Sequence, residues 1–147
     1  MTTTAHCFTY GSLMWADIMA RACGAEFASE PAALANHRRH PVRGQDYPGL
    51  LAAPGGLVPG RLYRDLDASA WARLDAFEGE EYDRVEVTVT LADGSPLPAH
   101  VYLFRAEFAQ RLLPGEWDAD AFEREGRARF TARYVGFDRF PEADRGQ

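Results

Sequence analysis

Apolar and polar residues alternate along several segments of the chain, as they do in strands that bury one face. Arg84 to Leu91 places charged or threonine side chains between aliphatic ones, which predicts a half-buried strand. The turn residues Asp93-Gly94 and the apolar run Ala99 to Phe104 predict that this strand pairs in a hairpin. His6 to Tyr10 and Leu57 to Leu66 predict two further strands.

Helical spacing of apolar residues replaces this alternation elsewhere in the chain. Leu13 to Cys23 carries its apolar residues on one face, and Gly24 follows at a position where glycine commonly ends a helix. A second, short helix is predicted to begin at an N-cap, Asp67 or Ser69, and to be closed by Gly79. Its apolar residues have the same helical spacing and are Trp71, Leu74 and Phe77.

The remaining segments complete a mixed order of elements. A helix is predicted from the N-cap Asp118 to about Tyr134, with one face formed by Phe122, Gly126 and Phe130. Residues 25–56 are predicted to form turns and short strands, because four prolines interrupt them: Pro31, Pro41, Pro48 and Pro54. This order favours an α+β fold, with a small mixed β-sheet that closes toward a barrel and is flanked by a few helices. We expect a single domain over residues 1–147.

The charge balance removes several classes of function. All 16 basic residues are arginine, so the chain has no Schiff-base lysine and no Walker-type phosphate loop. A net charge of −6 opposes binding to nucleic acid and to anionic membranes, and no segment has the length of apolar sequence that a membrane span requires.

Two cysteines are too few for a disulfide scaffold, which favours a cytoplasmic protein. The heavy use of alanine and arginine indicates a GC-rich, bacterial genome.

A glycine-containing turn joins the first predicted strand to the first predicted helix. In Tyr10-Gly11-Ser12-Leu13, successive backbone N–H groups are expected to point outward at the N-terminus of the helix. Such groups can hold a carboxylate or a developing oxyanion without a cationic side chain. The turn is therefore a candidate anion site, although Gly11 can also serve only to make the turn.

Glu78 lies at the end of the short helix, between Phe77 and the helix-breaking Gly79. The negative end of the helix dipole and the nearby aromatic surface both raise the pKa of a carboxyl placed there, which favours proton exchange near neutral pH. Glu80 and Glu81 are instead predicted to be solvated loop charges. The alternative is that Glu78 is also an exposed acidic residue, in a turn paired with arginine.

Four segments, taken in order, resemble those of one known family. Phe8-Thr9-Tyr10-Gly11-Ser12-Leu13 resembles the opening strand and substrate loop of the gamma-glutamylcyclotransferase-like proteins, which include the AIG2-like proteins. Leu74-Asp75, Phe77-Glu78-Gly79, Tyr82 and Arg84 are similar to the second signature of that family, whose glutamate is the catalytic acid/base. Two further segments match between them: Tyr47-Pro48-Gly49-Leu50 and Val58-Pro59-Gly60-Arg61-Leu62-Tyr63.

The resemblance implies a cavity for a gamma-glutamyl group and a cyclotransferase reaction. In that reaction the free α-amine attacks the γ-amide carbonyl, which gives 5-oxoproline and releases an amine or an amino acid. The resemblance implies that Glu78 is the acid/base and that no metal or other cofactor takes part. It also implies a set of substrate-binding residues: Tyr10, Gly11, Ser12, Leu13, Tyr82 and Arg84. The expected partner is thus a small gamma-glutamyl molecule.

A metal site is a competing hypothesis. His37 and His40 are three residues apart, and His6 or His100 could supply a third ligand. Arginines surround the pair and Pro41 disfavours a long helix, so a solvated loop is the preferred prediction for this segment.

Two other hypotheses concern the candidate site itself. A serine or cysteine hydrolase would use Ser12 or Cys7 with a histidine partner. Ser12 lacks the Gly-x-Ser-x-Gly turn, however, and a cysteine on a strand is usually a small buried apolar residue. A non-catalytic binding module of the same fold, in which Glu78 holds an ammonium group, also stays open.

Overall fold

Five strands close into a barrel in the computed structural model, which describes residues 4–134. The spatial order is β1-β3-β2-β4-β5, with β1 parallel to β5 and the other neighbours antiparallel. The strands are β1 (Ala5–Thr9), β2 (Ser29–Pro41), β3 (Pro48–Leu66), β4 (Tyr82–Leu91) and β5 (Pro96–Phe104). The predicted α+β fold, with a mixed sheet closing toward a barrel, is confirmed.

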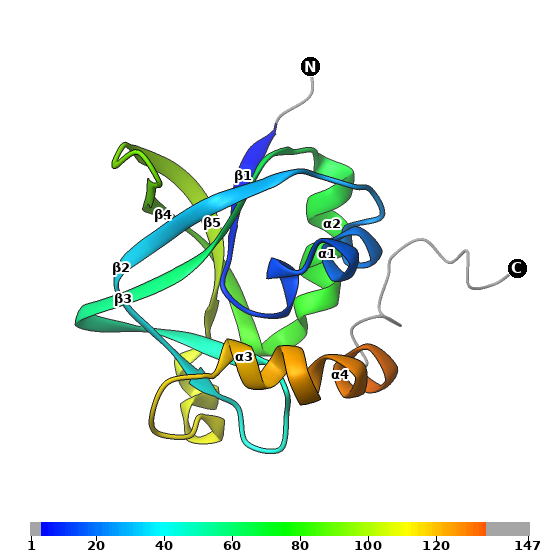
Figure 1. Cartoon of the computed structure of the whole chain (residues 1–147), viewed down its shortest axis with the longest axis vertical. Helices are drawn as coiled ribbons and strands as arrows, with labels where there is room; N and C mark the ends of the chain where they lie inside the picture. The colour runs from blue at the N-terminus through cyan, green and yellow to red at the C-terminus, as the bar shows by residue number, and fades with distance from the viewer. Residues whose placement is uncertain (1–3, 135–147) are drawn as a thin grey trace, which may run out of the picture.

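The helices cover the barrel from outside. Helices α1 and α2 pack against each other, and the segment from α3 to α4 crosses the lower part of the view in Figure 1. Their bounds are α1 (Ala16–Cys23), α2 (Ala68–Glu78), α3 (Ala119–Ala121) and α4 (Arg127–Arg133). Four further helical segments lie between these elements: η1 (Ser12–Met14), η2 (Gly79–Glu81), η3 (Ala106–Arg111) and the π-helical η4 (Phe122–Gly126).

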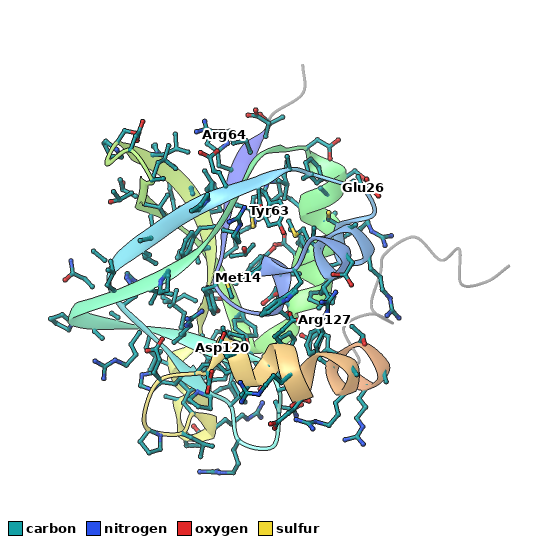
Figure 2. The ribbon with its side chains drawn as sticks, in the orientation of Figure 1. Met14, Glu26, Tyr63, Arg64, Asp120 and Arg127 are labelled. Atoms are coloured by element: carbon teal, nitrogen blue, oxygen red, sulfur yellow. The ribbon has the colours of Figure 1, made fainter. Side chains whose placement is uncertain are left out.

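Alternation along the strands sorts the apolar residues into two buried clusters. Phe8 and Tyr10 belong to the cluster inside the barrel, whereas Cys7, which precedes Phe8, belongs to the cluster under the helices. Figure 2 labels Tyr63 and Arg64 on β3: Tyr63 is buried in the cluster under the helices, whereas Arg64 is exposed and pairs with Glu30. The candidate site lies where these two clusters meet at the end of β1.

The prediction of short strands and turns over residues 25–56 is wrong in its lengths. Strands β2 and β3 are long and pair antiparallel from Ser29↔Tyr63 to Pro41↔Pro48. Pro41 and Pro48 stand at the end of this ladder, where a missing N–H costs little. Pro54 lies in an unpaired bulge opposite Asn36, whose side chain accepts a hydrogen bond from the Gly55 N–H.

The predicted helix from Leu13 to Cys23 is divided in the structure. The η1 turn uses the N–H groups of Met14 and Trp15 as donors to the carbonyls of Gly11 and Ser12, and Trp15 itself is extended at φ −85° and ψ 124°. The ring of Trp15 packs 4.8 Å from that of Phe122, centroid to centroid. This contact belongs to the tertiary structure, so local spacing does not reveal the break.

The other predicted elements are confirmed, with small changes at their ends. Asp67 rather than Ser69 caps α2, because its side chain accepts a hydrogen bond from the Ala70 N–H. Gly24 ends α1 in the left-handed conformation at φ 80°. The last predicted helix is divided into α3, η4 and α4, but its expected face is buried: Phe122, Gly126 and Phe130.

The segment from His37 to His40 was predicted to be a solvated loop, and this prediction is wrong. It is part of β2, and the side chain of Arg39 is buried beneath the loop that follows β1. The metal hypothesis finds no support, since no group of three or more potential ligands gathers anywhere in the described part of the chain.

Candidate active site

A pocket opens at the C-terminal ends of β1 and α2, beside the first residues of β3 and β4. It gathers side chains from five separate parts of the sequence, and α4 closes one side. The lining residues are Phe8, Thr9, Tyr10, Gly11, Ser12, Leu13, Tyr47, Pro48, Phe77, Glu78, Tyr82, Tyr102, Phe130 and Tyr134. Six of the seven site residues expected from the sequence are therefore brought together.

The loop after β1 lies against the start of β3. A Cβ atom at Gly11 would lie only 2.7 Å from Cδ of Pro48, so glycine is required here for close approach. The η1 turn begins at Ser12, and its hydrogen-bond donors are the N–H groups of Met14 and Trp15. The N–H groups of Ser12 and Leu13 come before these donors in the chain. These N–H groups have no partner within the turn, so they are suited to bind an anion in the pocket.

Glu78 is the last residue of α2 and is half-buried in the pocket wall. Burial first, and the negative charge of Glu78 second, raise the pKa values of the Tyr10 and Tyr102 hydroxyls. Glu78, Tyr10 and Tyr102 all line this pocket.

The pocket tyrosines hold the site in place through their hydroxyl groups. Tyr10 donates to the carbonyl of Tyr102 at 2.6 Å, and Tyr82 donates to the carbonyl of Pro48 at 2.7 Å. Tyr134 donates to the carbonyl of Phe77 at 2.8 Å, which ties the end of α4 to the last turn of α2. Each hydroxyl satisfies a backbone carbonyl, so these residues form a firm, uncharged wall.

Arg84 does not join this group. Its Nε lies 3.0 Å from Oδ1 of Asp75, and its guanidinium stacks over the ring of Trp71 at 4.4 Å. Tyr102 donates to the same Asp75 carboxylate at 2.7 Å. Arg84, which the resemblance implies to be a substrate-binding residue, therefore neutralises a protein carboxylate beside the pocket.

Two features of the site were not found from the sequence. Glu81 was predicted to be solvated, but its side chain is only 15% exposed; it accepts from Tyr47 Oη at 2.7 Å and from Arg111 Nη1 at 2.8 Å. The second feature is the aromatic wall formed by Tyr47, Phe130 and Tyr134, whose rings lie 4.7–6.3 Å apart. The burial of Phe130 was predictable from helical spacing, whereas its position beside Glu78 was not.

The pocket does not contain the parts of a serine or cysteine hydrolase. Ser12 lines it, but none of the four histidines, all of which lie within residues 4–134, is among its lining residues. Cys7 is fully buried, and burial together with the nearby Glu78 charge raises the pKa of its thiol. This supports the prediction that Cys7 is a small buried residue of the core.

Comparison with known proteins agrees with the fold. The family described as "Gamma-glutamyl cyclotransferase, AIG2-like" matches residues 7–119, which include every site residue expected from the sequence. The chain belongs to this gamma-glutamyl cyclotransferase, AIG2-like family. The resemblance found in the sequence is therefore confirmed.

Two relatives in this family are proteins of Arabidopsis thaliana. The chain is 29% identical to AIG2-like protein C over 140 residues, which cover 92% of this chain and 81% of the relative. It is also 29% identical to AIG2-like protein D over 140 residues, with 91% of each chain covered.

Solved structures show the same fold. A solution structure of an Arabidopsis thaliana protein matches with a TM-score of 0.71 at 23% identity, covering 88% of this chain and 79% of that one. A structure named "Gamma-glutamyl cyclotransferase" matches with a TM-score of 0.63 at 20% identity, covering 70% of this chain and 68% of that one.

Every helix within residues 4–134 is too short or too polar to cross a membrane.

Proposed function

We propose that this AIG2-like protein is a cyclotransferase that releases 5-oxoproline from a gamma-glutamyl amide. The observation that carries the proposal is the shared pocket of the Glu78 carboxylate and the Gly11–Leu13 backbone. A carboxylate that can move a proton and a row of N–H groups that can hold an anion are what this reaction needs. No metal or other cofactor is required.

Glu78 would act first as a base and then as an acid. The α-amine of the substrate, with a pKa of about 8, must lose a proton before it can attack. Once that proton has gone to solvent, the nitrogen forms a bond to the γ-carbonyl carbon, Glu78 takes a second proton from the same nitrogen, and the carbonyl oxygen becomes an oxyanion. The bond from this carbon to the leaving nitrogen then breaks, and Glu78 returns the proton to the released amine.

The Gly11–Leu13 loop would bind the negative charges of the substrate. Its N–H groups can hold the α-carboxylate or the developing oxyanion, and the firm tyrosine wall keeps the glutamyl chain folded for ring closure. Glu78 carries the only formal charge among the described residues of the lining. We infer that the pocket favours a leaving amine without a carboxylate of its own, since its lining within residues 4–134 holds no cation to neutralise one.

The decisive test is a panel of gamma-glutamyl amines and gamma-glutamyl amino acids, assayed for 5-oxoproline. Glu78→Gln keeps the size of the side chain but cannot exchange the proton, so turnover should fall at least about 100-fold. Glu80→Gln is the matched control, because Glu80 is an exposed neighbour outside the pocket lining. Wild-type turnover in Glu78→Gln would overturn the assignment.

The same panel separates an enzyme from a binding module. A module that only holds its ligand would bind gamma-glutamyl compounds and return them unchanged, with no 5-oxoproline from any substrate.

We place the reaction in the cytoplasm, since the two cysteines are unpaired in the structure, as is typical of a reducing compartment.

A further inference from the structure

Arg39 is a buried cation directly behind the candidate anion-binding loop. It lies on β2 and is only 7% exposed. Its Nη1 donates to the carbonyl oxygen of Tyr10 at 2.8 Å, and its Nε donates to Oε2 of Glu116 at 2.9 Å. The guanidinium also lies 5.3 Å from the ring centre of Trp117. Burying a guanidinium is costly, so these contacts must hold it firmly in place.

The position of the Tyr10 carbonyl gives this contact a consequence for the pocket. That carbonyl belongs to the peptide that joins Tyr10 to Gly11, and no cis peptide occurs among the described residues. In a trans peptide the N–H points away from the C=O, so the Gly11 N–H faces away from Arg39. Gly11 itself lines the pocket. Arg39 therefore sets the orientation of the Tyr10–Gly11 peptide, and Gly11, on the other side of that peptide, belongs to the candidate site.

A charged donor on a carbonyl oxygen also changes the peptide electronically. It draws electron density from the amide nitrogen, which makes the N–H of the same peptide a stronger donor. Glu116 offsets part of the Arg39 charge, but its side chain is 48% exposed, so water screens it more than it screens the buried guanidinium. Arg39 thus retains an effect on the Tyr10–Gly11 peptide.

We propose that Arg39 is a positioning residue, which orients the Tyr10–Gly11 peptide and strengthens the Gly11 N–H as a donor to a substrate anion. This rests on the proposed cyclotransferase function, because the anion is the α-carboxylate or the oxyanion of a gamma-glutamyl compound. Arg39 does not touch the substrate. In a chain without lysine, one buried arginine acts on the anion through the backbone.

The test compares Arg39→Met and Arg39→Lys with Arg64→Met. Arg64 is a suitable control, since it pairs with Glu30 on the outer surface. Arg39→Met should lower kcat/KM roughly tenfold or more, whereas Arg39→Lys should recover part of the loss with its single donor. Loss of an α-carboxylate contact raises KM, and loss of an oxyanion contact lowers kcat at constant KM; either result supports the proposal.

A spectroscopic readout separates this role from a purely structural one. The amide resonance of Gly11 should shift when 5-oxoproline is added to the wild type, and the shift should shrink in Arg39→Met. If Arg39→Met does not fold, Arg39→Lys carries the same comparison. Wild-type kcat, KM and Gly11 resonances in a folded variant would overturn the proposal.

The outcome for Arg39 can be distinguished from the outcome for the proposed function. A wild type that makes no 5-oxoproline from any substrate, but binds 5-oxoproline through Gly11, contradicts only the cyclotransferase. Turnover in the wild type with no response of Gly11 to 5-oxoproline contradicts only the role of Arg39.

Discussion

Replacing Gly11 with alanine is expected to force the candidate substrate loop away from β3. The added Cβ would lie 2.7 Å from Cδ and 2.8 Å from Cγ of Pro48. Carbon atoms in favourable contact are about 3.5–4.0 Å apart, so the loop or the proline ring must move by roughly 1 Å. The backbone of Pro48 is held in place, because its carbonyl accepts a hydrogen bond from the buried hydroxyl of Tyr82.

The size of this effect follows from the packing. Forcing an extra carbon into a filled interior costs about 1–3 kcal/mol, which for a domain of this length lowers Tm by roughly 2–12 °C. A shift of roughly 1 Å in a group that positions the substrate can cost about 100-fold in rate. We therefore expect Gly11→Ala to lose both stability and 5-oxoproline formation. Urea unfolding and the turnover assay measure the two effects separately.

Pro48→Ala provides the test of cause. It removes both ring atoms that the new Cβ would meet, so the double variant should be more stable than the sum of the two single changes predicts. The expected coupling is about 0.5–3 kcal/mol. Additive losses in the double variant, or a Gly11→Ala protein with wild-type stability and turnover, would show that this contact does not position the loop.

Three further outcomes are expected. First, the buried tyrosines have pKa values raised above the ordinary 10.0, chiefly by burial, so the folded protein keeps protons that the unfolded chain loses above that pH. The free energy of unfolding should then fall as pH rises beyond about 10, by up to about 1.4 kcal/mol per pH unit for each tyrosine; a flat profile between pH 9 and 11 would contradict this. Second, Cys7 and Cys23 are buried with raised thiol pKa values, so neither should react with a thiol reagent at pH 8 until urea unfolds the chain. Third, Glu81→Gln removes the charge that holds Tyr47 and Arg111, and should destabilise the protein by roughly 1–3 kcal/mol in urea unfolding; an unchanged midpoint would mean that the cluster is incidental.

Elements with a strong local signal were predictable from the sequence. The hairpin of β4 and β5 is specified by alternation over about eight residues and by the Asp93-Gly94 turn. The start of α2 depends on the Asp67 side chain and the N–H of Ala70, only three residues away. Glu78 could be selected for the same reason, because its place at the end of a helix is a local property.

The long strands and the buried charges were not predictable in this way. Pro41, Pro48 and Pro54 resemble strand breakers until the partner strand shows that they lie at a ladder end or in a bulge. Arg39 and Glu81 look like surface charges in the sequence, since nothing nearby in the chain differs from a solvated segment. Arg39 becomes a buried donor only when β2 passes beneath the loop at Tyr10, 29 residues earlier.

The sequence by itself therefore determined the class of fold, the glycine turn, the candidate acid/base and the absence of lysine. Each of these depends on residue identity or on neighbours within a few positions. The tertiary structure alone decided that Glu78 and the Gly11 loop line one pocket, that Arg84 is occupied by Asp75, and that aromatic rings from α4 close the wall. Those facts depend on contacts between distant residues, because burial and pairing arise only when the barrel closes.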